Sequence, residues 1–239
     1  MFDFGGVLTY SCWDIEVMSE IIANVLRRHN INVDDRFHEE FNRVMEDAWN
    51  RVIHTLIEEN MADLIAMTLR NIGIEPRQDI INEALDKISD APFCIVRKDA
   101  EKTLKTLKSM DLKIAVVSNA LINFHERVLK KENLIQYIDA IVVSCDVKYR
   151  KPHPRIYEIA LEKLGIRPSE AIFVGDVPEI DIVGAKKLGM ICVLMRTPEP
   201  YMQGRTMVSG IFSVEPDFII DELWEVVGIV NHINNKKRI

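Results

Sequence analysis

The sequence contains no apolar run close to the roughly 20 residues that a membrane-spanning helix requires, and no signal peptide precedes its first charged residues. We therefore expect a cytoplasmic protein with no membrane partner. Lysine and arginine are fewer than aspartate and glutamate, 30 against 37, and the net charge of −7 argues against a general binder of nucleic acid. Hydrophobic residues make up 48% of the 239 positions, which suits one large globular domain or a core with an insert.

Cysteine is scarce, and its spacing shows no CxxC or other metal-binding pattern. In a chain of this length we expect buried thiols rather than a disulfide or zinc framework. The six histidines form neither an HExxH motif nor a paired cluster, so a zinc hydrolase is not expected. Internal repeats and low-complexity segments are also missing. The four cysteines are Cys12, Cys94, Cys145 and Cys192.

Strand patterns are missing from residues 12–91, where apolar residues recur at three- and four-residue spacing. This periodicity predicts a separate unit of about four helices that ends at Ala91-Pro92. Beyond this point, short apolar runs alternate with amphipathic stretches, which predicts an α/β fold with a parallel sheet and right-handed crossovers. The expected strands cover residues 113–117, 138–143, 171–174, 190–195 and 218–220, and the expected helices cover residues 100–110, 124–131, 155–164, 182–188 and 223–232.

Two carboxylates follow the expected strand 171–174. Gly175 permits a sharp turn, so Asp176 would lie at the carboxyl edge of the sheet, where open α/β folds bind ligands. Asp181 lies at the start of the next helical stretch and can point to the same place. Two carboxylates in one place repel each other unless a cation lies between them, and oxygen ligands suit Mg²⁺. The alternative is that Asp176 caps a turn and Asp181 caps a helix.

Four short motifs, each weak alone, together resemble the haloacid dehalogenase-like hydrolases in their order and spacing across nearly the whole chain. The resemblance implies a doubly wound parallel sheet, a Rossmann-like core, with an inserted all-helical cap. The core would comprise residues 1–11 and 93–239, and the cap residues 12–92. The motifs are Asp3-Phe-Gly-Gly-Val-Leu-Thr9, Val117-Ser118-Asn119, Lys151-Pro152-His153-Pro154 and Gly175-Asp176 with Asp181.

The resemblance also implies a role for each motif residue in a Mg²⁺-dependent phosphatase. Asp3 would be the nucleophile that becomes an aspartyl phosphate. Lys151 and Mg²⁺ would offset the repulsion between this carboxylate and the phosphate, which is about 4 kcal/mol for two unit charges at ~4 Å and an effective dielectric near 20. Phosphate binding would fall to Ser118, Asn119 and Gly6, and metal binding to Asp3, the carbonyl of Gly5, Asp176 and Asp181, the last directly or through water.

Two positions depart from the family pattern. Gly5 stands where phosphatases of this family carry a second aspartate, whose acid–base help is typically worth 10²–10⁴-fold in rate. We therefore expect slow turnover of ordinary phosphomonoesters, with acyl and aryl phosphates affected least. In addition, only Met1 and Phe2 precede Asp3, so either the natural chain starts earlier or the first strand pairs poorly. Of these we favour an earlier start.

Two other functions remain open at this point. A 2-haloacid dehalogenase would use Asp3 to attack carbon without a metal, although dehalogenases usually carry an aromatic residue where Gly5 lies. A catalytically impaired phosphate- or partner-binding protein is the other alternative. The substrate and the oligomeric state, monomer or homodimer, are also open. We assign no catalytic role to Arg150 or His153, and we expect packing or surface roles for Trp13, Trp49 and Arg43.

Overall fold

The centre of the protein is a parallel sheet. The computed structural model describes residues 1–10, 14–91, 94–197 and 214–236. Within these residues β1 pairs with β2, β3 with β4, and β4 with β5, and every pair is parallel. The strands have three to five residues each, because each runs through the core for only a short distance. Their bounds are Ala115–Ser118 (β1), Ala140–Val143 (β2), Ile172–Gly175 (β3), Ile191–Met195 (β4) and Phe218–Ile220 (β5).

The first three residues join the two parts of this sheet. Phe2 forms a parallel bridge to Val116 of β1 on one side and to Val174 of β3 on the other. Its amide donates to the carbonyl of Ala115 at 2.9 Å, and the amide of Asp3 donates to the carbonyl of Val174 at 2.9 Å. The expectation that this short segment pairs poorly is therefore wrong, because its backbone is hydrogen-bonded on both sides. An earlier start of the natural chain stays a prediction.

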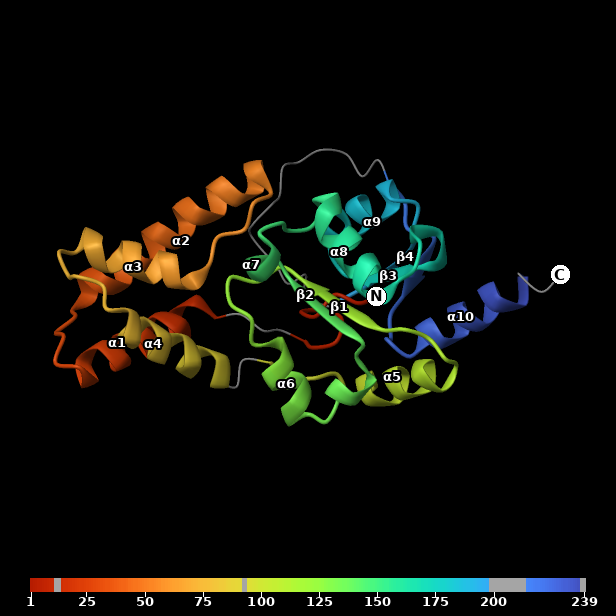
Figure 1. Cartoon of the computed structure of the whole chain (residues 1–239), viewed down its shortest axis with the longest axis horizontal. Coiled ribbons are helices and arrows are strands. Elements are labelled where there is room, and N and C mark those ends of the chain that lie inside the picture. Colours follow the sequence, from red (N-terminus) through yellow and green to blue (C-terminus); the bar gives the residue numbers. More distant parts are fainter. Residues whose placement is uncertain (11–13, 92–93, 198–213, 237–239) are drawn as a thin grey trace.

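Helices cover both faces of the sheet, which is the doubly wound arrangement expected from the resemblance. Strands that are buried on both faces have continuous apolar sequences, and their side chains point alternately to the helices on one face and on the other. In β1, Val117 packs in the hydrophobic cluster that contains α8, whereas Val116 packs in the cluster that contains α5 and α10. Figure 1 shows the two pairs of helices on opposite sides of the strands: α5 (Ala100–Ser109) with α10 (Glu225–Lys236), and α8 (Pro154–Leu164) with α9 (Val183–Lys187).

Shorter helical elements connect the strands. The helix α6 lies close to its expected position, whereas α7 was not predicted, because four residues are too few to show a helical period. A π-helical turn, η3, precedes α9 and contains Asp181. The bounds are His125–Lys131 (α6), Ser144–Val147 (α7), Ile135–Tyr137 (η1), Pro168–Glu170 (η2) and Pro178–Ile182 (η3).

The segment without strand patterns forms helices α1 to α4, as expected. Figure 1 shows them as a group of their own beside the sheet, with α1 in contact with α2 and α4, and α3 in contact with α2 and α4. Asp14 caps the first helix by accepting hydrogen bonds from the amides of Glu16 and Val17. The apolar stripe of each helix is buried inside the group. The bounds are Ile15–Arg28 (α1), Asp35–Thr55 (α2), Met61–Asn71 (α3) and Gln78–Asp90 (α4).

The expectation about cysteines is correct for two residues and wrong for one. Cys192 is a buried thiol and Cys145 a half-buried one, whereas Cys94 is disulfide-bonded. Sequence spacing did not indicate this bond, because it cannot show which distant segments meet in the fold. Cys12 lies outside the described residues. None of the helices in the described ranges has both the length and the apolar character needed to cross a membrane.

Candidate active site

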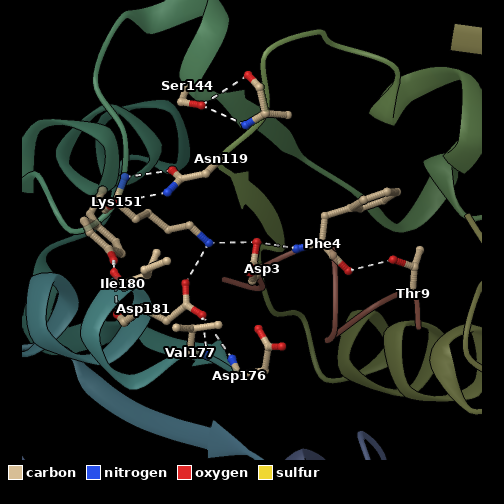
Figure 2. A network of polar contacts seen from close by, with 12 residues as sticks. Asp3, Phe4, Thr9, Asn119, Ser144, Lys151, Asp176, Val177, Ile180 and Asp181 are labelled. Atoms are coloured by element: carbon tan, nitrogen blue, oxygen red, sulfur yellow. Dashed lines mark hydrogen bonds and ion pairs between the residues drawn. The ribbon is translucent and has the colours of Figure 1, made fainter. Parts of the chain in front are cut away.

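The polar motif residues meet at one edge of the sheet. Asp3 follows the bridging residue Phe2, Ser118 ends β1, and Asp176 follows β3. Because the carboxyl ends of parallel strands share an edge, these three side chains come together although they are far apart in the sequence. They line a cleft of about 490 Å³, as do Lys151 and Asp181. Figure 2 shows Asp3, Lys151, Asp176 and Asp181 converging from separate segments of the chain.

Lys151 lies between two carboxylates. Its Nζ is 2.7 Å from Oδ1 of Asp3 and 2.7 Å from Oδ1 of Asp181, and its side chain is 1% exposed. Burial alone would lower the pKa of this ammonium group, but the two carboxylates outweigh burial and raise it. The lysine is therefore held charged beside the expected nucleophile.

The side chain of Asn119 fixes the backbone of the lysine. Its Oδ1 accepts a hydrogen bond from the amide of Lys151 at 2.7 Å, and its Nδ2 donates to the carbonyl of the same residue at 3.0 Å. The loop after β1 and the loop that carries the lysine are thus tied together at the site (Figure 2). The sequence suggested a phosphate contact from the backbone of Asn119; the structure adds this positioning contact from its side chain.

Asp176 forms no ion pair with any of the residues that the structure describes. Both of its carboxylate oxygens are buried without a hydrogen-bond partner among the described residues. Burial, followed by repulsion from Asp181 and Asp3, raises its pKa from 3.8 to about 8. The pKa of Asp3 is raised to about 6, chiefly by burial and against the influence of Lys151. An unpartnered buried carboxylate is costly, so the cluster favours a bound cation.

The geometry of this acidic cluster fits a divalent ion. Asp3, Asp176 and Asp181 each offer one carboxylate oxygen, and these oxygens lie within 4.8 Å of one another. Hard oxygen ligands from carboxylates are those that Mg²⁺ takes. Gly6, with φ +79°, lies against the cluster, since a Cβ at this position would be 2.0 Å from Oδ2 of Asp176. The glycine lets the backbone approach the carboxylate closely, which no side chain would permit.

Asp181 is the most firmly held member of the cluster. While its Oδ1 bonds Lys151, its Oδ2 accepts hydrogen bonds from the amides of Asp176 and Val177, both at 3.0 Å. The hydroxyl of Tyr157 donates to the carbonyls of Ile180 and Asp181 at 2.8 and 3.1 Å, which anchors the π-helical turn. The observed contacts of Asp181 therefore position the lysine and the turn around Asp176.

A family model described as haloacid dehalogenase-like hydrolase matches residues 1–189, which is well over half of the chain. The chain belongs to the haloacid dehalogenase-like hydrolases. One curated relative of this hydrolase is a glyceraldehyde 3-phosphate phosphatase of Methanopyrus kandleri, 28% identical over 70% of this chain and 71% of its own. Another is a putative pyrophosphatase PpaX of Clostridium perfringens, 32% identical over 74% of each chain. For several other curated relatives the match spans between 58% and 63% of their length.

Solved structures show the same fold. A 2-haloacid dehalogenase of Pseudomonas syringae pv. Tomato DC3000 superposes with a TM-score of 0.70 over 97% of this hydrolase and 96% of its own chain, at 18% identity. At that identity the likeness shows the fold alone. It confirms the expected α/β class.

The remaining motif residues of the hydrolase lie where the sequence placed them. Ser118 is buried and lines the cleft, and Gly5 also lines the cleft. His153 caps α8 by accepting a hydrogen bond from the amide of Arg155 at 3.1 Å, which fits the loop role expected for it. Arg43 makes exposed ion pairs on α2, as expected for a surface residue. Trp49 lines the cleft, so the packing or surface role expected for it is wrong, and Trp13 lies outside the described residues.

His125 is a residue of the cleft that no pattern in the sequence singles out. His125 lines the cleft at 1% exposure, and its Nε2 is buried with no partner in the described part of the chain. Burial, and then Lys151, lower its pKa to about 3, so the imidazole is neutral. Its ring lies against those of Phe4 and Phe124, with centroids 4.6 and 4.7 Å away. A lone histidine in a helical pattern gives no indication of such a place.

Proposed function

We propose that this hydrolase is a phosphatase that acts on a small phosphorylated molecule through an aspartyl phosphate on Asp3, with Mg²⁺ as its cofactor. The observation that carries the proposal is the pairing of Lys151 with Asp3 and Asp181 beside the unpartnered Asp176. A fixed ammonium group next to a carboxylate nucleophile attracts a phosphoryl group that the carboxylate alone would repel. The curated phosphatase and pyrophosphatase relatives support this reaction class.

The proposed metal ligands are Asp3, Asp176 and the carbonyl of Gly5, with Asp181 as a direct or water-mediated ligand. An ion held there supplies positive charge against the phosphoryl oxygens. The unpartnered oxygens of Asp176 and the raised pKa values of Asp176 and Asp3 support this choice, because the ion favours the ionised carboxylates.

The chemistry of the chain's own residues then runs in two steps. Oδ1 of Asp3 is engaged by Lys151 and by the amide of Phe4 at 2.7 Å, which leaves Oδ2 to attack phosphorus. A bond from Asp3 to phosphorus forms as the bond to the leaving oxygen breaks. Water then attacks phosphorus, the bond to Asp3 breaks, and inorganic phosphate is released. Ser118 and the backbone of Asn119 and Gly6 hold the phosphoryl oxygens in this proposal.

The substrate class follows from Gly5, which offers no side chain to protonate a leaving group. Leaving groups that are stable as anions need no such proton, so acyl and aryl phosphates are the preferred substrates in this proposal. We further propose that residues 12–92 form a cap over the cleft and that residues 1–11 and 93–239 form the core. The support is that Met45, Ala48 and Trp49 of α2 line the same cleft as the motif residues.

The deciding experiment is hydrolysis of p-nitrophenyl phosphate with and without Mg²⁺, in the wild type and in Asp3→Asn. We expect metal-dependent hydrolysis that disappears in the variant, and a ³²P label on Asp3 that is acid-stable and hydroxylamine-labile. Chloride release from 2-chloropropionate in the presence of EDTA would instead establish a dehalogenase. No turnover of acyl, aryl or sugar phosphates, together with retained phosphate binding, would favour a binding protein.

A further inference from the structure

A buried ion pair connects the helical group α1–α4 to the core. Glu58 lies in the connection between α2 and α3, and its Oε1 is 3.3 Å from Nη1 of Arg150. The side chains of this pair are 1% and 7% exposed. Buried charges of opposite sign that lie this close depend on each other, because either one alone would be left without solvent or counter-charge. The pair therefore holds the two parts of the molecule in one relative position.

The arginine of this pair is the residue immediately before Lys151. The backbone around it is paired with the α2–α3 connection: the amide of Arg150 donates to the carbonyl of Leu56 at 3.1 Å, and the amide of Glu58 donates to the carbonyl of Lys148 at 2.8 Å. Between them, Ile57 and Tyr149 form an antiparallel bridge. A short piece of the α2–α3 connection thus pairs in antiparallel fashion with the loop that carries Lys151.

The second oxygen of Glu58 reaches the other loop of the site. The hydroxyl of Ser144 donates to Oε2 of Glu58 at 2.7 Å and accepts a hydrogen bond from the amide of Ala120 at 2.8 Å. Ala120 directly follows Asn119, whose side chain brackets the backbone of Lys151. Figure 2 shows Ser144, Asn119 and Lys151 along this line of contacts.

We propose that Glu58 is a positioning residue, which aligns the loop after β1 and the loop of Lys151 only while the α2–α3 connection lies against the core. One carboxylate contacts the loop of Lys151 through Arg150 and the loop after β1 through Ser144, so its place sets the separation between these two loops. In this proposal the phosphoryl site forms only when the helical group packs against the core, so the two occur together. The kinetic part of this inference rests on the proposed phosphatase activity, whereas its structural part does not.

Three variants separate this role from a general loss of stability. Glu58→Gln keeps the shape of the side chain but removes the charge that pairs with Arg150 and accepts the hydrogen bond of Ser144. The double variant Glu58→Gln/Arg150→Met removes both charges, so no buried charge is left alone. Arg127→Met is the matched control. Arg127 also pairs across the two parts, with Asp86 at 2.6 Å and Asp90 at 2.9 Å, but its side chain is 49% exposed and these ion pairs involve neither loop.

The first measurement is amide hydrogen exchange, which needs no substrate. In Glu58→Gln we expect faster exchange in peptides that cover residues 118–121 and 148–151, and not only in residues 56–60. The second is the rate with p-nitrophenyl phosphate and Mg²⁺, where we expect kcat to fall by about 10- to 100-fold, the size of effect that a small misplacement of catalytic groups produces. Glu58→Gln is expected to lower the Tm. In the double variant we expect the Tm to return towards the wild-type value while kcat stays low. Arg127→Met is expected to change neither readout.

Unchanged exchange in the two core loops of Glu58→Gln would overturn the inference. So would a double variant that regains the wild-type kcat together with its Tm, or an Arg127→Met variant that resembles Glu58→Gln. If the wild type shows no metal-dependent hydrolysis, the proposed function fails, and the exchange comparison alone decides whether Glu58 aligns the loops.

Discussion

The clearest prediction concerns Asp176 and the dependence of stability on pH. Its pKa of about 8 in the folded protein, against 3.8 in an unfolded chain, means that the native carboxyl keeps a proton that the unfolded chain has lost. The free energy of unfolding therefore falls as the pH rises from about 4 to about 8, and it is flat above that. At about 1.4 kcal/mol for each pKa unit, the loss across the window is on the order of 5 kcal/mol without metal.

Replacement of Asp176 by Asn removes this titration. In EDTA we expect urea denaturation to show a shallower fall between pH 4 and pH 8 for Asp176→Asn than for the wild type, and a higher free energy of unfolding for the variant at pH 8. A smaller fall between pH 4 and pH 6 remains, because the pKa of Asp3 is also raised, to about 6. The exposed Glu39 on α2 gives a matched control, and Glu39→Gln is expected to follow the wild-type curve.

Mg²⁺ is expected to oppose this fall in the free energy of unfolding with rising pH. Because the ion takes the ionised carboxylates, it competes with the proton on Asp176, so it stabilises the wild type more at pH 8 than at pH 5. Asp176→Asn is expected to lose most of the Mg²⁺-dependent shift in Tm at pH 8. The reasoning is refuted if the variant keeps the wild-type slope in EDTA, or if Mg²⁺ shifts the wild-type Tm equally at both pH values.

Three further predictions follow from the same site. Lys151→Met leaves Asp3 and Asp181 facing each other in a buried place. We expect the free energy of unfolding, measured with denaturant, to fall by about 3–5 kcal/mol and hydrolysis to be lost. An unchanged stability would contradict the buried pairing. Gly5→Asp is expected to raise turnover of alkyl phosphates by about 10²–10⁴-fold while turnover of aryl phosphates changes little; an equal gain for both would show that leaving-group protonation is not what Gly5 lacks. His125→Phe removes a buried Nε2 that has no partner among the described residues, so we expect a Tm equal to or above that of the wild type, with about 1 kcal/mol at stake. A clear fall in the Tm would show that the contact of its Nδ1 with Oδ1 of Asn123, at 3.3 Å, outweighs this gain.

Much of the fold was predictable because it depends on local patterns. Helical periodicity located the helices of the group α1–α4, and the short apolar runs located each strand of the core to within two residues or so. The motif residues were predictable as a set, because parallel strands bring their carboxyl ends to one edge. The edge rule placed Asp176 there, and the resemblance to the family implied that Asp3 and Ser118 share its site; all three line one cleft.

The contacts that depend on the tertiary arrangement were not predictable. Nothing in the sequence indicates that Glu58 pairs with Arg150, or that Tyr157 holds the turn around Asp181, because their partners are fixed only once distant segments pack. The same holds for the disulfide of Cys94.

The bridge at Phe2 has a consequence for how the protein is assembled. One part of the sheet is made of residues 115–143 and the other of residues 172–220, and the three residues at the beginning of the chain lie between them. During synthesis residues 1–3 leave the ribosome before both of their partners, so they can pair only after Val116 and then Val174 have followed. Closing the seam brings Asp3, Lys151 and the acidic cluster together in the same step. Completion of the sheet and assembly of the cleft therefore coincide.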